Sequence, residues 1–548
     1  MLFKRIIPIV AVFGLALSPL QVQISHSIGQ KLLPPSHPYG GVLVIGSSNP
    51  PLAINPVITN TGISMSVASL VFNRLIHFRP DGELEPELAE SWDISADGLV
   101  YTFHLRRGIQ FHDGEEFTSE DVLFTYTAIQ DPAAQSPYHA FMKPVVSFSA
   151  PDRYTFKVTL EKPYVPFINE MVREIIPKHL YVGTSLRNNE FNYKPVGTGP
   201  FRFEKWLPDN QIILRANPDY FEGRPYLDKI IFKTYEKRSE VWTAFMRQEV
   251  DLISFMHPED YEITKKDPIF KTYACPTADY YVINYDLEDP VLADQNLRIA
   301  LAHAVNTQEL IDKVEHGYGV KCVGPFQPGY WTFNPDVKPF AYDPSLAMEI
   351  LKKDGWKDAD GDGILEKDGR SLAILMAVDA EDEKLRTIAF SIRQQLQEVG
   401  IKLEIQFYSE KTDLAPALSL RKPQAHLTLF LGNAPDPHQA VKVWDSRDSR
   451  KYKFWNNRAV DQEVDRMIEL GEVTMEKYTR RRIYQELHQR IYQWQPACFL
   501  YFPYDFHAVS KTVEGTDPLF ESPYMPEYTI KDLWIRRRTT PKDRKGVM

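Results

Sequence analysis

One short loop in the chain carries residue types that bind a hard cation. Asp358, Asp360 and Asp362 alternate along the chain and Gly363 follows them, which matches the first half of a calcium-binding loop. Gly369 occupies the twelfth position, where such loops carry a bidentate Glu. We therefore expect at most weak calcium binding, in a structural role. The alternative is a surface hairpin loop rich in Asp and Gly that holds no metal.

A second polar loop follows a predicted strand around residue 433. Residues 430–437 read Phe-Leu-Gly-Asn-Ala-Pro-Asp-Pro, and an aromatic residue, Trp444, comes shortly after them. Loops of turn-forming residues at strand ends often form pocket walls and carry binding residues. Asn433, Asp436 and Trp444 are therefore candidates for ligand contacts.

The sequence lacks the common local motifs of catalysis. It contains no Gly-x-Ser-x-Gly elbow, no Gly-x-x-x-x-Gly-Lys-[Ser/Thr] loop, no Gly-x-Gly-x-x-Gly fingerprint and no His-Glu-x-x-His motif. We do not expect an enzyme, although acidic residues that converge only in the fold keep a hydrolase as an alternative. His112 beside Asp113, and His438 after Asp436, are possible metal ligands; histidines hydrogen-bonded beside turns are the commoner interpretation.

Composition narrows the class of protein further. The chain has 548 residues, enough for three or four domain-sized units, and its formal net charge of −10 argues against a nucleic-acid partner. None of its three cysteines forms a Cys-x-x-Cys pair, so a zinc or thioredoxin-like site is not expected. Cys275 and Cys322 could form a disulfide that leaves Cys498 free, or all three could be unpaired buried thiols.

The N-terminus has the layout of a secretory signal peptide. Lys4 and Arg5 precede an apolar run over residues 6–17, and polar residues follow from Gln21. We assign residues 1–27 to this signal, with an uncleaved anchor as the alternative. Because no Cys lies near its end, we do not expect a lipoprotein. No later apolar run approaches the length of about 18 residues that a membrane span needs.

Residue periodicity predicts many alternating strands and helices. Residues 88–126 predict a strand, a turn, a short strand, a second turn and a helix with a capping box of Thr118 and Asp121. The remaining helices are predicted over residues 64–75, 239–248, 296–305, 345–354, 383–399 and 475–494. Strands are predicted at 42–46, 201–206, 230–235, 251–255, 280–285, 372–378, 401–407, 425–431 and 498–502.

Two of these stretches carry a family resemblance. The segment LAESW…DGLVYTFHLRRGIQFHDGEEFTSEDV begins at Leu88, and PVGTGPF begins at Pro195, with Leu214, Asn217 and Tyr220 after it. Both resemble family 5 extracellular solute-binding proteins, the peptide- and nickel-type binding proteins of ABC importers. The resemblance implies an α/β fold of the periplasmic-binding-protein type (type II), in which two lobes built from three domains contain mixed sheets flanked by helices.

The resemblance also implies domain limits and a binding cleft. Domain I would comprise residues 30–75, 196–284 and 505–548, domain II residues 76–195, and domain III residues 285–504. The cleft would be lined by Asn60 and Thr61 from the first lobe, by Asn284 at the hinge, and by Asn433, Asp436 and Trp444 from the second lobe.

Asn433 departs from the pattern of the peptide-binding relatives. In those proteins an Asp stands three residues before the acid of this loop and pairs with the α-ammonium group of the ligand. Asn433 takes its place here, and a neutral amide supplies no full counter-charge for a buried cation. This weakens the case for a ligand with a free amino terminus, unless Asp436 turns inward to compensate; Asn433 could equally be a simple turn residue.

We therefore expect an exported, periplasmic, monomeric binding protein without a cofactor. It would capture an oligopeptide or a peptide-like solute between its lobes and deliver it to the transmembrane permease subunits of an ABC importer. The alternatives are a binder of a nickel-type metal chelate or another small solute, and a ligand-presenting sensor or chaperone.

Overall fold

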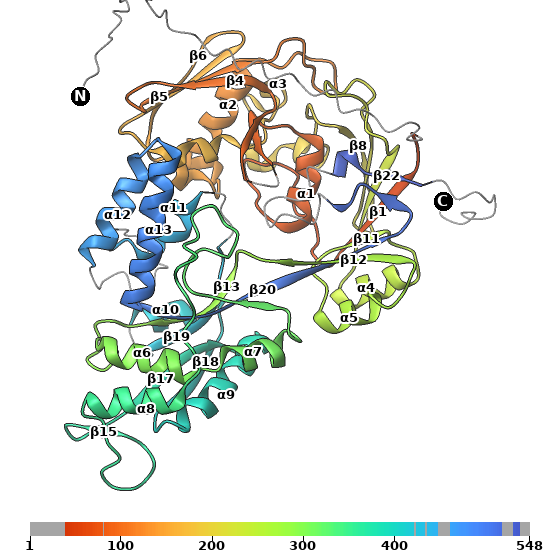
Figure 1. Ribbon diagram of the computed structural model, residues 1–548. Helices are drawn as coiled ribbons and strands as arrows, with labels where there is room; N and C mark the ends of the chain where they lie inside the picture. The colour runs from red at the N-terminus through yellow and green to blue at the C-terminus, as the bar shows by residue number, and fades with distance from the viewer. Residues whose placement is uncertain are drawn as a thin grey trace, which may run out of the picture. The chain divides into compact units, whose positions relative to one another are not determined.

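The computed structural model describes residues 39–79, 82–420, 423–432, 436–447, 461–517 and 530–536 (Figure 1). The predicted signal peptide and Asn433 lie outside these ranges. None of the helices in the described ranges is long and apolar enough to cross a membrane.

A mixed sheet of twelve strands is the main element of the fold. Its order is β18-β17-β19-β13-β20-β11-β1-β10-β9-β8, and β12 and β14 also pair with β20. The strands are β1 Val42–Ser47, β8 Phe201–Trp206, β9 Gln211–Ala216, β10 Lys229–Thr234, β11 Leu252–Ile253, β12 Phe270–Pro276, β13 Tyr280–Tyr285, β14 Gly319–Lys321, β17 Ala373–Asp379, β18 Lys402–Tyr408, β19 Ala425–Phe430 and β20 Ala497–Ser510.

Strand β20 joins the two halves of this sheet. Its first residues pair antiparallel with β13, and its last residues pair antiparallel with β12 and β11 (Figure 1). The sequence predicts a strand that ends at Phe502, but the structure extends it to Ser510. Pro503, which normally argues against a strand interior, lies where the partners of β20 change from β13 and β14 to β12.

Strand β1 pairs parallel with both β10 and β11, so three strands end at one edge of the sheet. The nearby helices are α1 Gly62–Val71, α4 Arg238–Met246 and α5 Pro258–Thr264. Helix α1 ends four residues earlier than predicted, because Phe72 already has extended backbone angles.

The loop that contains Gly197 and Gly199 packs directly on the end of α1. The amide of Gly199 donates to the carbonyl of Val71 (2.8 Å). A Cβ atom on Gly197 would lie 2.1 Å from that carbonyl oxygen, and one on Gly199 would lie 2.5 Å from the oxygen of Leu70. These glycines are required by close backbone approach, not by a left-handed conformation.

A second, four-stranded sheet carries the segment that first indicated the family. Its order is β4-β5-β7-β6, with β4 Ala89–Ile94, β5 Val100–Leu105, β6 Val145–Asp152 and β7 Thr155–Leu160, and helix α2 Ser119–Gln130 packs on it. The predicted capping box is present: the amide of Thr118 donates to the Asp121 carboxylate (2.9 Å). Tyr101, Phe103 and Leu105 are buried, as their alternation predicts.

The helices between residues 295 and 494 pack around strands β13, β17, β18 and β19 or against one another. They are α6 Gln295–Ala304, α7 Thr307–Val314, α8 Pro344–Lys353, α9 Glu383–Gln397, α10 Leu414–Ser419, α11 Pro437–Val441, α12 Gln462–Val473 and α13 Lys477–Trp494. Smaller described elements are β2 Ile76–Phe78, β3 Leu84–Pro86, β15 Glu366–Lys367, β16 Arg370–Ser371, β21 Val513–Glu514, β22 Trp534–Ile535 and α3 Lys178–Tyr181.

The buried side chains form separate hydrophobic clusters. One draws on residues from Leu43 to Phe232 together with Val509, Val513, Ile530 and Leu533, and another draws on residues from Tyr281 to Tyr501. The predicted limits 284/285 and 504/505 fall inside β13 and β20, and β20 pairs with strands of both halves of the large sheet. The three-domain division stays a prediction.

Candidate functional site

A pocket of about 280 Å³ lies at the edge of the sheet where β1, β10 and β11 end. Residues of these strands, of α1 and α4, and of the segments that follow β1 and β11 line it. In sheets with parallel strands, the crevice outside the carboxyl ends of the strands is the usual place for a ligand. Its volume is close to the lower end of the range of about 300–1,000 Å³ for small-molecule sites.

The pocket is lined by buried apolar side chains and by serine hydroxyl groups. The floor is made of buried side chains: Ile45, Ile63, Phe232, Val241 and Leu252. Serine hydroxyl groups stand along the walls, at Ser47, Ser48, Ser66, Ser69 and Ser254. Apolar walls with a few convergent polar groups are typical of ligand pockets.

Four charged or titratable side chains line the pocket. Arg74 donates to the Glu174 carboxylate (2.5 Å), so these two charges compensate one another. Burial lowers the pKa of His507 to about 4, so this imidazole is neutral at pH 7. The fourth is Arg238, an exposed residue in the first turn of α4.

Phe255 stands at the mouth of the pocket in an unusual conformation. Its φ of 60° lies in the left-handed region, which is costly for a residue with a bulky side chain. Its ring is 53% exposed and meets the ring of His507 edge-on at 5.6 Å. Strained and exposed apolar residues are concentrated at binding sites, which makes Phe255 a candidate ligand contact.

The first-lobe candidates Asn60 and Thr61 directly precede this pocket in the chain. Both are exposed, and the hydroxyl groups of Thr59 and Thr61 lie 3.3 Å apart. Thr61 is the N-cap residue of α1, but its side chain makes no capping hydrogen bond. Gly62 and Ile63, the next two residues, do line the pocket. Asn60 and Thr61 therefore stand beside the pocket, outside its lining.

The other candidates do not join this pocket in the described structure. Asn284 is buried in β13, opposite His426 on β19 and Ala497 on β20. Trp444 is buried in a hydrophobic cluster with its ring edge-on to Phe499 at 5.8 Å.

Asp436 is buried, and its carboxylate is paired with an arginine of the protein. The Arg480 guanidinium donates to both of its carboxylate oxygens (2.7 and 2.8 Å), and the amide of His438 donates to the same carboxylate as the cap of α11 (2.9 Å). Burial acts against ionisation, but the Arg480 charge outweighs it and lowers the pKa of Asp436. These contacts give Asp436 a structural partner.

Gly432, the residue before Asn433, is hydrogen-bonded to the acidic residue Asp279. The amide of Gly432 donates to the Asp279 carboxylate (2.9 Å). Asp505 lies on β20 two residues before His507, and burial, with a smaller contribution from the charge of Asp279, raises its pKa to about 6. The carboxylate of Asp279 therefore lies next to the position where Asn433 replaces the Asp of the peptide-binding relatives.

The acidic loop brings its carboxylates close together. Oxygen atoms of Asp358, Asp360, Asp362 and Glu366 lie within 4.8 Å of one another. Glu366 occupies the ninth position, and its side chain accepts a hydrogen bond from the amide of Ala359 (2.7 Å). Because the loop is exposed and its carboxylates also accept hydrogen bonds from loop amides, weak calcium binding stays a prediction.

Of the two histidines considered as metal ligands, His112 is hydrogen-bonded within the protein, whereas the ring nitrogens of His438 are buried without a hydrogen-bond partner in the described part of the chain. His112 accepts a hydrogen bond at Nδ1 from the amide of Gly197 (3.3 Å), and its Nε2 lies 2.9 Å from the carbonyl of Gly199. His438 is buried and packs edge-on against Tyr164, with Nε2 3.4 Å from the Glu472 carboxylate. Burial is the main cause that lowers the pKa of both imidazoles.

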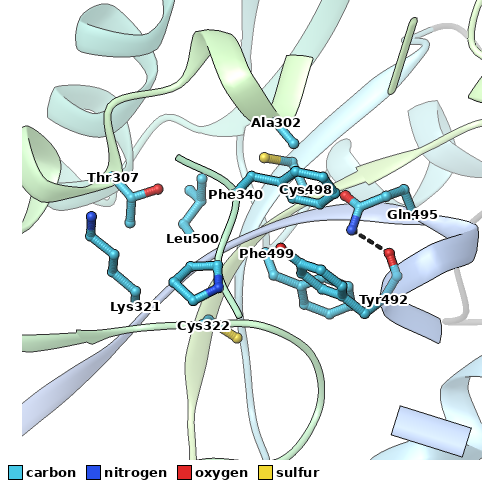
Figure 2. A pocket seen from close by; sticks show the side chains of 11 residues that line it. Ala302, Thr307, Lys321, Cys322, Phe340, Tyr492, Gln495, Cys498, Phe499 and Leu500 are labelled. Atoms are coloured by element: carbon cyan, nitrogen blue, oxygen red, sulfur yellow. Dashed lines mark hydrogen bonds between the residues drawn. The ribbon is translucent and has the colours of Figure 1, made fainter. Parts of the chain in front are cut away.

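A much smaller cavity, of about 20 Å³, lies beside β20 and contains two of the cysteines. Figure 2 shows the side chains of Cys322 and Cys498 among those that line this cavity, together with Phe340 and Phe499. All three cysteines are free thiols. Burial raises the pKa of Cys498 to about 12, which makes this thiol unreactive at pH 7.

None of the residues that line the larger pocket was predicted as a site residue, including the three with the most distinctive side chains, Arg238, Phe255 and His507. Arg238 reads as an ordinary helix-start residue, and His507 lies in the part of β20 that was not predicted. Phe255 was predicted as the last residue of a strand, although the strand ends at Ile253. The alternation of elements between residues 230 and 255 was the signal that could have led to the pocket, since it predicts parallel strands with a common edge.

The large mixed sheet and the pocket at its parallel edge define a solute-binding fold of the periplasmic type. Residues 83–451 match the family model described as bacterial extracellular solute-binding proteins, family 5. The chain belongs to this family, whose members bind substrates and are not enzymes.

Individual relatives cover nearly the whole chain. The oligopeptide-binding protein AppA of Bacillus subtilis is 26% identical over 91% of this chain and 92% of its own. Its structure in complex with a nonapeptide matches with a TM-score of 0.69 at 26% identity, over 91% of this chain and all of that chain. The dipeptide-binding protein of Escherichia coli is 26% identical over 87% of this chain and 92% of its own.

A nickel-binding structure is equally similar. NikZ of Campylobacter jejuni, in complex with Ni(L-His), matches with a TM-score of 0.73 at 25% identity and covers 90% of this chain and 99% of that chain. Family and fold are therefore shared by proteins with different ligands, and the function common to them is that of the solute-binding component of an ABC transporter.

Proposed function

We propose that this protein binds an oligopeptide or a peptide-like solute outside the cytoplasm and delivers it to the permease of an ABC importer. The observation that carries the proposal is the pocket at the ends of β1, β10 and β11, an apolar cavity with hydroxyl groups on its walls. In a family of solute-binding proteins, an apolar cavity of this kind, next to the predicted contacts Asn60 and Thr61, supports its assignment as part of the ligand-binding site.

The strand that joins the halves of the large sheet supports closure as the mechanism. Strand β20 pairs with β13 in one half and with β12 in the other, and bending at a few positions between two lobes is enough to bring them together. The ligand would stabilise the closed form through contacts with both lobes. The permease would then recognise that form.

Native mass spectrometry of gently purified protein tests this proposal, because a closed binding protein can retain its ligand. We expect an additional mass that corresponds to a peptide. Calorimetric titration then compares short peptides with the nickel–histidine complex, and we expect heat from the peptides only. Binding of the nickel complex without peptide binding would contradict the peptide proposal and favour a chelate binder. Turnover of the bound solute by pure protein would contradict both.

The role proposed for Asn433 has its own test. If Asn433 faces the amino terminus of the ligand, Asn433→Asp supplies a counter-charge and should raise the affinity for free peptides about tenfold relative to N-acetylated peptides. Asp279→Asn serves as the comparison, because its carboxylate accepts from the neighbouring Gly432 amide. An unchanged ratio in Asn433→Asp would place Asn433 away from the ligand terminus.

A further inference from the structure

Arg238 is a charged side chain at the pocket mouth whose charge no lining group balances. Within the described part of the chain, no hydrogen bond or ion pair to protein is formed by its guanidinium, although its charge favours the ionised form of Asp505. Arg74 and Glu174, the other fully charged lining groups, are paired with each other. A guanidinium recognises a planar carboxylate with two parallel hydrogen bonds.

The floor of the pocket is suited to an apolar group of the ligand. Ile63, Phe232, Val241 and Leu252 are at most 5% exposed, and they present hydrocarbon to a cavity of about 280 Å³. An apolar group that fills this space removes that surface from water, which is favourable. The ring of Phe255 stands at the mouth, where it can cover such a group.

The guanidinium of Arg238 and the apolar floor together match two simple kinds of ligand poorly. A small inorganic anion would pair with Arg238 but leave the apolar floor exposed to water. A neutral apolar compound would cover the floor but form no ion pair with the guanidinium. A ligand that satisfies both regions carries an anionic group and an apolar group within reach of each other.

We infer that this pocket binds the carboxylate-bearing end of a solute with an apolar side group, the carboxylate on Arg238 and the apolar group on the floor under Phe255. The inference rests on the proposed function, because it assigns the chemistry of the same site. For a peptide, it places an apolar residue at the carboxyl end in the first lobe.

Paired probes that differ only in charge test this inference. One pair is a set of short peptides that end in an apolar residue, supplied as free acids and as C-terminal amides. The other is 3-phenylpropionate and its amide, which contain no peptide bond. Affinities are measured by calorimetry on the mature protein, on Arg238→Gln and on Arg247→Gln. Arg247 is the matched control, an exposed arginine at the other end of α4 that does not line the pocket.

We expect the acids to bind about ten- to a hundredfold more tightly than the amides. Arg238→Gln should reduce the affinity for acids to that for amides, and Arg247→Gln should change neither. Peptides that bind equally well as acids and amides, or an unaffected Arg238→Gln variant, would overturn the inference and leave the proposed function intact. Binding of 3-phenylpropionate through Arg238 without any peptide binding would overturn the proposed function, and it would leave the roles of Arg238 and of the apolar floor intact. No binding of either pair would overturn both.

A second variant tests the apolar half of the site independently of charge. Ser66 lies on the pocket wall in α1 and is half-buried, so Ser66→Leu places a larger side chain in the cavity. We expect both acids and amides to lose at least tenfold in affinity, with an unchanged far-UV circular dichroism spectrum. Full affinity in this variant would show that the cavity is not the site of the apolar group.

Discussion

The buried pair of Asp436 and Arg480 shows how a loop side chain becomes part of the core. The buried guanidinium donates to both carboxylate oxygens and to the carbonyl of Gly471 (2.8 Å). Removing one partner of such a pair leaves an uncompensated buried charge, which is far more costly than the net gain from the intact pair.

Asp436→Asn should therefore destabilise the protein by about 3 kcal/mol or more. Urea unfolding at pH 7 measures this change. The matched control is Asp219→Asn, which removes the largely exposed partner of Arg202 and should have a much smaller effect. If Asp436 instead contacts the ligand, its substitution would lower affinity and leave the unfolding midpoint nearly unchanged.

Phe255 offers a test that separates stability from binding. A left-handed conformation costs a residue with a side chain about 1–2 kcal/mol, and glycine avoids that cost. Phe255→Gly should therefore keep or raise stability, whereas it should lower ligand affinity about tenfold through loss of the ring. Gln135→Gly, at an exposed site with φ of 50°, should change stability in the same direction. Full affinity in Phe255→Gly would contradict its role as a ligand contact.

At the level of elements, the position of α1 depends on the glycine loop behind it. Gly197 and Gly199 contact the last carbonyls of α1, and the first turns of the same helix line the pocket. The loop is also bonded to His112 and to the Asn217 side chain, whose Nδ2 donates to the carbonyl of Gly199 (3.0 Å). Packing far from the pocket therefore sets the shape of the pocket.

Gly199→Ala should destabilise the protein by about 2–3 kcal/mol, since its Cβ would meet backbone atoms that cannot move freely. We expect a lower midpoint in urea unfolding, together with weaker ligand binding at temperatures where the variant is folded. Gly319→Ala is the control, because its new Cβ would meet only side-chain atoms, the nearest at 3.0 Å. Equal effects of the two substitutions would contradict this account of the loop.

Local signals in the sequence predicted the elements that have strong local causes. The capping box fixes the start of α2, and the alternation of Tyr101, Phe103 and Leu105 fixes the faces of β5. The part of strand β20 after Phe502 was not predicted, because it pairs with strand β12, which lies more than two hundred residues earlier in the chain. Long-range pairing has no local signature around Pro503.

The same distinction applies to the candidate site. Asn60 and Thr61 could be placed beside the pocket because they precede α1. The pairing of Asp436 with Arg480 could not be predicted, because Arg480 lies 44 residues further along the chain. Arg238, Phe255 and His507 come together only when β1, β10, β11 and β20 assemble into one sheet.

At the scale of the whole molecule, buried imidazoles make stability depend on pH. Burial is the main cause that lowers the pKa of several histidines from 6.5 to about 4 or 3, among them His112, His426, His438 and His488. The unfolded chain therefore binds more protons than the folded one below pH 6.5, and stability falls as the pH drops toward 4. Glu87 and Asp505 act in the opposite direction, since burial raises their pKa values to about 7 and about 6.

Between pH 7 and pH 5 we expect a loss of about 2 kcal/mol or more in the free energy of unfolding, because the histidines outnumber these two acids. Urea titrations at the two pH values measure it. His438→Phe keeps an aromatic ring against Tyr164 and removes one titrating group, so the loss should shrink by about 1–2 kcal/mol. A free energy of unfolding that is equal at both pH values would contradict the buried neutral state of these histidines.

If the solute binds at the edge where β1, β10 and β11 end, a bound peptide should protect the backbone amides around the pocket. Hydrogen exchange with and without a peptide that binds in calorimetry measures this protection. We expect slower exchange in residues 47–49, 62–69 and 254–256 on addition of the peptide, and no change in the acidic loop at residues 358–366. Unchanged exchange in the three pocket segments, with protection elsewhere in the protein, would contradict binding at this edge.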